Sequence, residues 1–418
     1  AGLVVELRRM KKGKRIIVVL DDGSGRIECP LFEDKAAEYG PLLQADTLVI
    51  VEGSLSYDDF SDGFRLNANH VMDIEGARAA YASRILLQLQ AEGRNDIDGL
   101  VDHLAGCIDR YKADAGCDVV IALGGGSTLD TAKAAACVAT TGASIDAYWG
   151  FDLIPEPARY PVIAMPTTAG TGSEASRVSV IADSEGKKAV YSDYLQPRVA
   201  LVDPLLLRTL PPLLTAVTGL DALGHALECT ASKKSHALGD AVAREAMQAG
   251  AAAFVGAIDN GLEDGAARYG MARCALLAGL LLSPINTGAG HALGYGIEKI
   301  SYELGNPVPH GAAVALVLPG VMRHNAPVAA DKYYYAAGVA GLDLKDKSRE
   351  DGAELAAAWI DNLRRRYTPY TSLSAVGLEE GDIPRMVELA MSVRRLLDPN
   401  PVEVFPEDAE AIYRGIFD

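Results

Sequence analysis

The sequence predicts a multidomain protein with an N-terminal β-barrel, a helical connector, a partial α/β unit and a C-terminal all-α domain. Five short stretches of alternating polar and apolar residues fill positions 1–75, whereas continuous apolar stretches followed by glycine-rich loops occupy positions 115–204. Beyond Pro204 only helical periodicity remains. These three patterns differ in period, so they predict separate folding units. A chain of 418 residues also exceeds what one hydrophobic core usually organises.

Residues 1–75 have the pattern of a small antiparallel barrel. Short runs rich in β-branched residues alternate with turn sequences such as Lys12-Gly13 and Asp22-Gly23. The predicted strands are 3–7, 15–20, 26–32, 47–55 and 64–71. Five such strands in about 75 residues predict an OB-like β-barrel.

The middle of the chain changes from helical to α/β character. Residues 76–114 are predicted to form a helical connector, because 75–91 is rich in alanine and 97–112 has helical periodicity. In 115–204, apolar strands at 118–123, 161–165 and 199–202 alternate with a glycine turn, a helix and a loop of Thr, Gly and Ser. Continuous apolar strands are typical of parallel sheets that are covered on both faces. This segment is therefore predicted to be a partial α/β unit.

Composition and charge limit the classes of protein that fit. A content of 49% hydrophobic and 23% charged residues is typical of a soluble globular protein. The net charge of −17 argues against general nucleic-acid binding, because phosphate recognition needs a basic surface. Six scattered cysteines without a C-x-x-C pair predict reduced thiols in a cytoplasmic protein. No apolar stretch is long enough for a bilayer, so no membrane partner is expected. The chain begins without methionine or a signal-peptide pattern, as expected of a sequence that starts inside a longer protein.

A glycine turn between a predicted buried strand and a predicted helix is the first candidate site. It reads Gly124-Gly125-Gly126-Ser127, and Asp130 follows it. Glycines let the backbone approach a phosphate closely, and a helix N-terminus offers unpaired N–H groups and a positive dipole. The turn therefore predicts a dinucleotide-binding unit in 115–204. A glycine-rich turn that binds nothing has the same pattern and remains the alternative.

Residues 205–418 are predicted to form an all-helical metal-binding domain. They are rich in Ala and Leu, and the prolines that are expected to break the helices stand at 284, 307, 309, 319 and 369. Asp221 and His225, spaced i, i+4, share one helix face. His291 and His310 each adjoin a glycine in the same domain. One carboxylate and three imidazoles suit a divalent ion such as iron or zinc. For the Asp221–His225 pair alone, a buried histidine with an acidic partner is the alternative.

The loop 166–176 is the third candidate site. It follows a predicted buried strand, so it should lie at the carboxyl edge of the sheet, where open α/β folds bind ligands. The hydroxyl groups of Thr167, Thr168 and Ser176 could hydrogen-bond ribose, phosphate or amide groups. Loops of glycine and threonine also serve as ordinary connectors.

Together these segments resemble the iron-containing alcohol dehydrogenase family. Its patterns occur as GGGSTLDTAK (124–133), PTTAGTGSEAS (166–176), TGLDALGHALE (218–228) and VPHG (308–311). The resemblance covers about residues 115–418 and implies a metal-dependent alcohol dehydrogenase or aldehyde reductase. The metal ligands that it implies are Asp221, His225, His291 and His310. The cofactor-binding positions that it implies are Gly125, Gly126 and Ser127 for the pyrophosphate, and Thr167, Thr168, Ser176 and Lys188 for the nicotinamide nucleotide.

The resemblance also implies cofactors, substrate and assembly. Fe²⁺ is the usual ion of the family and Zn²⁺ suits the same ligands, while the hydride carrier is NAD or NADP. The expected substrate is a small alcohol or aldehyde, and a homodimer is possible by resemblance. Many members carry a second histidine four residues after the third ligand, where this chain has Tyr295. Its hydroxyl can donate a hydrogen bond at the catalytic site, but it is a poor proton relay near neutral pH.

Residues 1–111 resemble a different protein, the OB-fold region of a bacterial DNA polymerase III alpha subunit. The likeness runs from AGLVVELRRMKKGKRIIVVLDDGSG to FRLNANHVMDIEGARAAYA. The chain therefore looks like a chimera joined near residues 112–117. Contact with single-stranded nucleic acid is the property that the barrel would inherit. Its many acidic and few aromatic residues favour a solvated surface instead, so nucleic acid is not expected as the main partner. The alternative function is a nucleic-acid-binding OB module fused to a truncated, inactive dehydrogenase.

Overall fold

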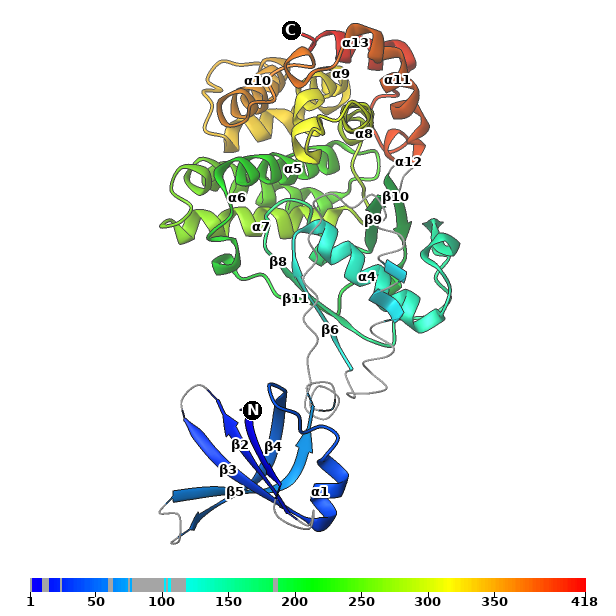
Figure 1. Ribbon diagram of the computed structural model, residues 1–418. Coiled ribbons are helices and arrows are strands. Elements are labelled where there is room, and N and C mark those ends of the chain that lie inside the picture. The colour runs from blue at the N-terminus through cyan, green and yellow to red at the C-terminus, as the bar shows by residue number, and fades with distance from the viewer. Residues whose placement is uncertain are drawn as a thin grey trace. The chain divides into compact units, whose positions relative to one another are not determined.

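The protein divides into two compact units (Figure 1). One unit comprises residues 1–88 and 109–117, and the other comprises residues 89–108 and 118–418. The computed structural model describes residues 2–9, 15–22, 25–58, 63–73, 76, 101–102, 104–106, 118–182 and 187–418. Most of the predicted connector, 76–114, lies outside the described residues.

The first unit is a closed barrel in which the strands follow the order β1-β2-β3-β5-β4. The elements are β1 (Gly2–Arg9), β2 (Arg15–Asp21), β3 (Arg26–Phe32), α1 (Glu33–Tyr39), β4 (Leu48–Asp58) and β5 (Gly63–Met72). Alternate side chains such as Val4, Val18 and Val49 point inward and are almost fully buried, because successive residues of a strand face opposite sides. The predicted β-barrel and its five strands are confirmed.

The second unit contains a parallel sheet with the order β11-β8-β6. Its strands are β6 (Val120–Gly124), β8 (Val162–Pro166) and β11 (Val199–Ala200), and helix α4 (Gly126–Thr141) follows β6. Leu129 and Ala136 of α4 pack on Ala122 and Ala164 of the sheet. Among the described residues only one face of β6 is covered, since Ile121 is 51% exposed whereas Ala122 is 3% exposed. The expectation of a strand buried on both faces is wrong for this part of the sheet.

Helical residues on the N-terminal side of β6 already belong to this unit. Val101 and Leu104 are buried against Ala134 and Val138 of α4. The Asp102 carboxylate accepts hydrogen bonds from the Ser144 hydroxyl and from the Ile145 backbone N–H. The described residues between 101 and 106 are thus part of the α/β packing.

A second small sheet with the order β7-β10-β9 was not predicted from the sequence. It consists of β7 (Gly150–Phe151), β9 (Val178–Ala182) and β10 (Lys187–Tyr191), with β10 parallel to β7 and antiparallel to β9. Short 3-10 helices connect the elements of this region: η1 (Ile145–Tyr148), η2 (Ser173–Ala175), η3 (Asp193–Leu195) and η4 (Pro204–Leu207). This sheet carries Lys187 and Tyr191, which both reach the site described below.

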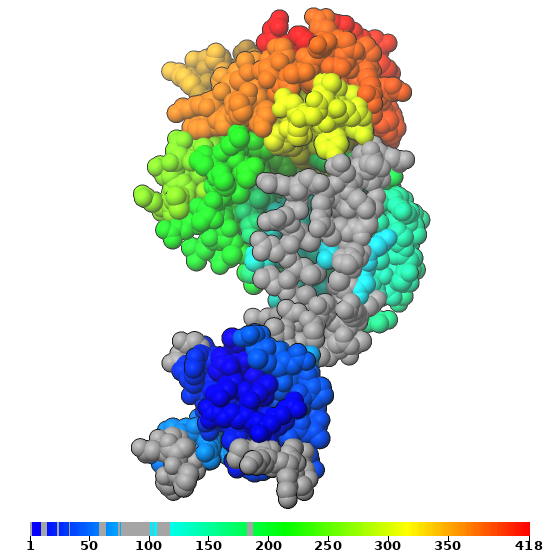
Figure 2. Space-filling model, in the orientation of Figure 1, coloured from blue at the N-terminus to red at the C-terminus, as the bar shows by residue number. Residues whose placement is uncertain are grey.

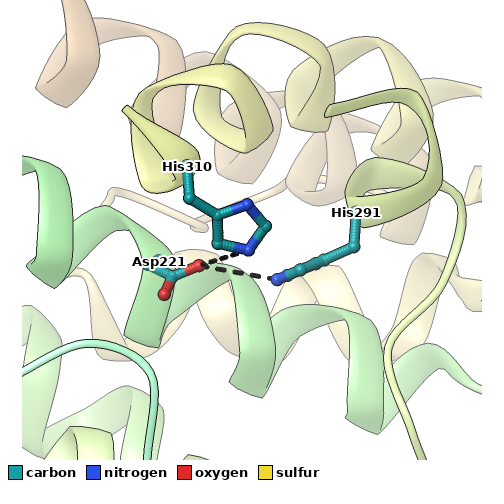
Figure 3. Close-up of side chains that lie close together, drawn as sticks. All are labelled: Asp221, His291 and His310. Carbon is teal, nitrogen blue, oxygen red and sulfur yellow. Dashed lines mark ion pairs between the residues drawn. The ribbon is translucent and has the colours of Figure 1, made fainter. Parts of the chain in front are cut away.

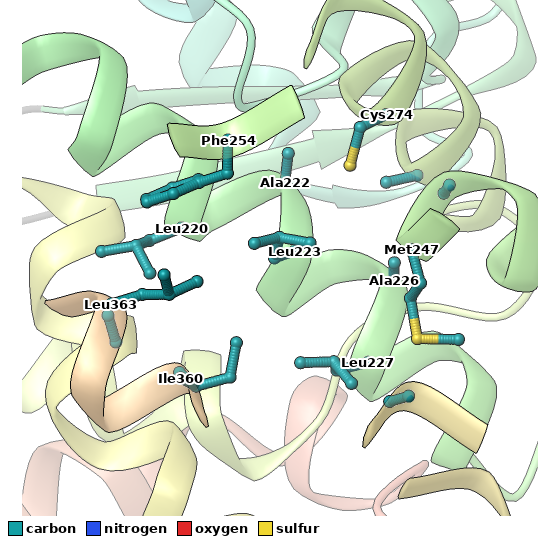
Figure 4. Packing of buried hydrophobic residues seen from close by; sticks show 14 of the residues in the cluster. Leu220, Ala222, Leu223, Ala226, Leu227, Met247, Phe254, Cys274, Ile360 and Leu363 are labelled. Atoms are coloured by element: carbon teal, nitrogen blue, oxygen red, sulfur yellow. The ribbon is translucent and has the colours of Figure 1, made fainter. Parts of the chain in front are cut away.

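Beyond β11 the chain is helical, as predicted. The elements are α5 (Pro212–Ala231), α6 (Ala237–Asp259), α7 (Gly265–Leu281), α8 (Ala289–Glu303), α9 (His310–Val339), α10 (Arg349–Tyr367), η5 (Ser374–Val376), η6 (Glu380–Asp382), α11 (Ile383–Ser392), α12 (Arg394–Leu397) and α13 (Pro406–Arg414). Helix α5 is central, because Leu220 and Leu223 pack against Phe254 of α6 and Ile360 of α10 (Figure 4). The C-terminal helices form one continuous surface, coloured yellow to red in Figure 2.

One of the predicted helix breaks is wrong. Pro319 lies inside α9 rather than at its end. The proline removes one backbone hydrogen bond, but its neighbours Leu316, Leu318 and Val321 are fully buried. This burial stabilises the helix more than the missing hydrogen bond weakens it. Among the described helices, none combines the length and apolar character that a bilayer span requires.

Candidate functional site

The four predicted metal ligands converge although they come from three helices. Asp221 and His225 lie one turn apart on α5, His291 is in the first turn of α8, and His310 begins α9. The Asp221 Oδ1 atom lies 3.7 Å from His225 Nε2, 3.5 Å from His291 Nε2 and 3.7 Å from His310 Nε2. Figure 3 shows His291 and His310 directed at the same carboxylate oxygen. Ligand atoms of Asp221, His291 and His310 all lie within 4.8 Å of one another.

The unsatisfied polar atoms of this cluster fit a bound cation. Asp221 Oδ1, His291 Nε2 and His225 Nδ1 are buried and form no hydrogen bond. A buried polar atom without a partner costs about 1–3 kcal/mol, and a cation bound by both Asp221 Oδ1 and His291 Nε2 would satisfy these two atoms. One carboxylate oxygen and imidazole nitrogens are donors that Fe²⁺ and Zn²⁺ accept. The His225 ring also stacks on His291 with centroids 4.6 Å apart, which holds both rings in place.

The protonation of the cluster reflects burial and the negative charges around it. Burial lowers the pKa of His225 to about 4. Burial also acts to lower the pKa of His291, but the carboxylates of Glu228 and Asp221 outweigh it and raise that pKa to about 10. For Asp221, burial is outweighed by the imidazoles, first that of His225, so its pKa lies well below the usual range. Asp221 is therefore ionised at neutral pH and available to a cation.

Two glutamates orient the imidazoles and were missed in the sequence. Glu228 of α5 pairs through Oε2 with His291 Nδ1, and its Oε1 accepts a 2.6 Å hydrogen bond from the Gly290 N–H. Glu298 of α8 pairs with His310 Nδ1. Each contact leaves Nε2 as the free nitrogen that faces Asp221. A sequence signal existed, because each glutamate follows a ligand of its own helix by seven residues, which is two turns.

Glycine makes room for the first of these glutamates. A Cβ atom at Gly290 would lie 2.8 Å from Glu228 Oε1. The glycine that adjoins His291 in the sequence is thus a steric requirement of the carboxylate–imidazole contact. Gly311 similarly lets the start of α9 approach α5, since a Cβ atom there would lie 2.1 Å from the Val217 carbonyl oxygen.

The cluster opens on the side of His310. The His310 side chain is 25% exposed, whereas that of Asp221 is 4% exposed. The Tyr295 ring stacks on His310 with centroids 5.5 Å apart. Lys187 of β10 pairs with Glu298, and its ammonium lies 5.7 Å from the centre of the Tyr295 ring. Tyr295 and Lys187 therefore lie beside the most exposed of the four candidate ligands.

The glycine turn forms the N-terminus of α4, as predicted. Gly125 is the N-cap and has extended backbone, and no side chain caps the helix. The first N–H groups of α4 thus remain open to an anion. A Cβ atom at Gly126 would lie 2.6 Å from the Thr171 methyl group, so the close packing of the loop requires glycine there. Ser127 is exposed beside the turn.

The threonine–glycine loop lies between the glycine turn and the ligand helix. The Thr167 N–H donates a 2.9 Å hydrogen bond to the Gly124 carbonyl. A Cβ atom at Gly125 would lie 3.3 Å from the Thr168 methyl group. Farther along, Gly170 packs against Thr218, one turn before Asp221. The loop thus contacts both the glycine turn and α5, the helix that carries Asp221.

The remaining predicted cofactor residues differ in their contacts. The Asp130 carboxylate accepts hydrogen bonds from the Ser173 hydroxyl (2.5 Å) and the Val180 N–H (2.9 Å), so it is turned toward protein rather than toward the turn. Ser176 is buried, and its hydroxyl donates to the Val178 carbonyl at 3.4 Å. Lys188 is partly exposed on β10, with its ammonium 5.7 Å from the centre of the Trp149 ring.

Comparison with family models divides the chain in the same way as its structure. The model described as iron-containing alcohol dehydrogenase matches residues 97–204. The model for the C-terminal part of the Fe-containing alcohol dehydrogenase family matches residues 215–417. A model described as OB-fold nucleic acid binding domain matches residues 1–74. The dehydrogenase match starts at residue 97, before the helical residues that pack on α4.

Individual relatives agree with these matches. Sulfoacetaldehyde reductase of Bilophila wadsworthia is 34% identical over 77% of this chain and 82% of its own length. A crystal structure of 1,3-propanediol oxidoreductase superposes with a TM-score of 0.72 at 32% identity, covering 77% of this chain and 82% of the other. The structure of sulfoacetaldehyde reductase from Bifidobacterium kashiwanohense in complex with NAD⁺ has a TM-score of 0.67 at 31% identity and covers 78% and 82%.

The family matches account for the ligand cluster, the glycine turn and the helical domain in one unit, and for the barrel in the other. Two families that are matched by separate parts of the chain confirm its chimeric organisation. Through residues 97–417 the chain belongs to the iron-containing alcohol dehydrogenase family, and this part follows an OB-fold domain.

Proposed function

We propose that this protein is a metal-dependent alcohol dehydrogenase or aldehyde reductase that uses NAD or NADP. The observation that carries the proposal is the meeting of Asp221, His225, His291 and His310 around unsatisfied buried atoms. The loop 166–176 next to them also contacts the glycine turn. Membership of the family and the NAD⁺ complex of a relative support iron and NAD as the cofactors.

Each part of the site has its own task. A divalent ion held by the four ligands would supply a Lewis acid that lowers the pKa of an alcohol or polarises a carbonyl. The open N–H groups at Gly125, Gly126 and Ser127 would bind the pyrophosphate, and Thr167, Thr168 and Lys188 would line the nucleotide. The exposed side of His310, beside Tyr295, would admit the substrate. Oxidation of the alcohol transfers a hydride from carbon to the nicotinamide and releases the hydroxyl proton.

Metal analysis combined with an absorbance assay tests the proposal. Purified protein is expected to hold one divalent ion per chain and to change absorbance at the reduced-cofactor band with NAD or NADP and short alcohols or aldehydes. Asp221→Ala and His225→Ala should lose both the ion and activity. His324→Ala, in the same helix as His310 but outside the cluster, is the matched control and should keep both. Unchanged metal content in Asp221→Ala and His225→Ala would contradict the proposal.

The barrel supports a second candidate function, the binding of single-stranded nucleic acid. Phe32 is exposed with the Arg15 guanidinium 4.8 Å from the centre of its ring, and Tyr57 and Phe64 form an exposed edge-to-face pair at 5.4 Å. Exposed rings beside arginine offer a surface on which bases stack. A gel-shift titration with single-stranded DNA at two salt concentrations tests it. Binding at low salt that Phe32→Ala weakens would support this function, and no shift at low salt would remove it.

A further inference from the structure

Arg395 carries a charge that no acidic group in the described part of the chain neutralises. The residue belongs to α12 and is only partly exposed. Its Nη1 donates a 2.6 Å hydrogen bond to the Tyr191 hydroxyl, and its Nη2 donates a 3.4 Å hydrogen bond to the Tyr295 hydroxyl. The guanidinium carbon lies 5.7 Å and 5.6 Å from the centres of these two rings. Among the described residues no carboxylate lies within 4.0 Å of the guanidinium.

The neighbouring cations show that this arrangement is specific to Arg395. Arg394, the preceding residue, is exposed and pairs with Asp398 at 2.7 Å. Lys187 pairs with Glu298. A charge withdrawn from water without a counterion is costly, so a half-buried arginine that contacts only phenols indicates a binding partner outside the chain. A guanidinium has five N–H donors, and the hydrogen bonds to Tyr191 and Tyr295 use two of them.

The position of Arg395 relative to the candidate metal ligands indicates what kind of molecule would bind it. The phenol of Tyr295 lies between them, with its ring stacked on His310 and its hydroxyl bonded to Arg395. His310 marks the open side of the cluster. A substrate whose oxygen lies at the ligand cluster would therefore need a second polar group on the far side of Tyr295 to meet the guanidinium.

We propose that Arg395, with the hydroxyls of Tyr191 and Tyr295, is a subsite for an acidic group of the substrate. The substrate is then a short alcohol or aldehyde that also bears a carboxylate, sulfonate or phosphate. Arginine suits this task because its planar fork binds two oxygens of an oxyanion at once, and the tyrosine hydroxyls add further polar contacts. The same charge disfavours a cationic substrate. This inference rests on the proposed dehydrogenase function and deepens it by naming a substrate class.

A comparison of substrates of opposite charge tests the subsite. Succinic semialdehyde, sulfoacetaldehyde and glycolaldehyde phosphate represent the three acidic groups, butanal is the neutral control and betaine aldehyde the cationic control. The wild type is expected to reduce at least one acidic aldehyde with a kcat/KM well above that for butanal, and betaine aldehyde worst of all. Arg395→Gln should lower kcat/KM for the acidic aldehyde about 100-fold, mainly through KM, and leave butanal nearly unchanged. Arg395→Lys should recover part of the loss, and Arg394→Gln should have no effect.

A binding measurement separates this inference from the proposed function. Isethionate and 4-hydroxybutyrate are the alcohols formed from two of the acidic aldehydes, and calorimetry measures their affinity for the metal-loaded protein without turnover. If Arg395→Gln reduces the affinity for isethionate or 4-hydroxybutyrate and leaves butanol binding unchanged, the subsite is supported. This holds even if the absorbance assay shows no dehydrogenase activity. A wild type that prefers butanal overturns the subsite and leaves the dehydrogenase in place. Equal losses for acidic and neutral ligands in Arg395→Gln show a structural role and also overturn it.

Discussion

The orientation of two of the three imidazoles, those of His291 and His310, depends on a carboxylate behind each ring. Glu228 takes the Nδ1 nitrogen of His291 and Glu298 takes that of His310, which leaves the Nε2 nitrogens toward Asp221. Such partners fix the tautomer and the ring direction, and their loss typically weakens metal binding by about 10–100-fold. At the scale of single residues, affinity for the ion is thus shared between ligands and their supports.

Glu228→Gln tests this support. We expect the affinity for Fe²⁺ or Co²⁺ to fall by about 10–100-fold, because a neutral amide holds the His291 proton less firmly than a carboxylate. The measurement is a metal titration with the Co²⁺ absorption spectrum as the readout. Glu245→Gln is the control, since Glu245 is on the surface and pairs with Arg273 at 2.8 Å. Equal affinity of Glu228→Gln and Glu245→Gln would show that the carboxylate has no such role.

Glu174, a buried acid in the loop 166–176, gives a prediction about how stability depends on pH. Burial raises the pKa of Glu174 above its usual range, so the folded protein holds this proton more tightly than the unfolded chain. The free energy of unfolding that the protonated Glu174 contributes is fully present below about pH 4.5, near the pKa of the unfolded chain. It is lost as the pH rises through the pKa of the folded protein. Glu174→Gln should therefore unfold at higher urea concentration than the wild type at pH 7, and the difference should vanish near pH 4.5. If Glu174→Gln were less stable than the wild type at pH 7, this explanation would be excluded.

The convergence of the four candidate ligands was easier to anticipate from the sequence than the two glutamates behind them, for a physical reason. Asp221 and His225 stand one helical turn apart and form a recognisable pair, and histidines are few. Glu228 and Glu298 belong to 56 acidic residues, most of which are solvated on helix surfaces. Likewise, the sequence alone does not show that Arg395 contacts two phenols and no carboxylate of the described residues.

Secondary structure was predictable where one face of an element is buried and the other is not. The five barrel strands alternate, so their period is plain in the sequence. Strands β9 and β10 have five residues each, and β7 has only two. Their pairing depends on contacts between distant segments, such as the Val180 N–H with Asp130 of α4, which no local pattern reveals.

Two glycines with positive φ make a matched pair for testing the loop that carries the threonines. Gly172 has a φ of 62° and a Cβ atom there would lie 2.3 Å from Gly279 of α7, whereas Gly142 has a φ of 70° and open space around it. Gly142→Ala should cost about 1–2 kcal/mol through backbone strain alone. Gly172→Ala should cost about 1–3 kcal/mol more, because the added methyl group separates the loop from α7. Urea unfolding measures both, and equal costs would mean that the contact with Gly279 adjusts freely.

At the scale of the whole molecule, the barrel and the dehydrogenase part have separate hydrophobic cores. The sequence predicted this division from two resemblances, and the family matches confirm it. The position of the boundary was harder to predict, because helical periodicity alone does not tell whether residues near 97–114 pack on the barrel or on α4. Burial of Val101 and Leu104 against α4 shows that these two residues belong to the dehydrogenase part.

Separate cores predict two thermal transitions in calorimetry. Removing the metal with EDTA should lower only the transition of the dehydrogenase part, because the ion joins α5, α8 and α9. The loss corresponds to about 4 kcal/mol when the ion is present at a thousand times its Kd. Val18→Ala, which opens a cavity in the barrel, should lower only the other transition. A single transition that both changes shift would show that the two parts unfold together.

The carboxylates around the histidines also bear on the valence of the ion that the proposed site would prefer. Asp221, Glu228 and Glu298 bring three negative charges, and the ammonium of Lys187 brings one positive charge. With neutral imidazoles, two negative charges remain without compensation in a low-dielectric interior. A dication makes the cluster electroneutral, whereas an alkali ion leaves it anionic and a trication makes it cationic. On this count the site would favour a divalent ion, and charge alone would not distinguish Fe²⁺ from Zn²⁺.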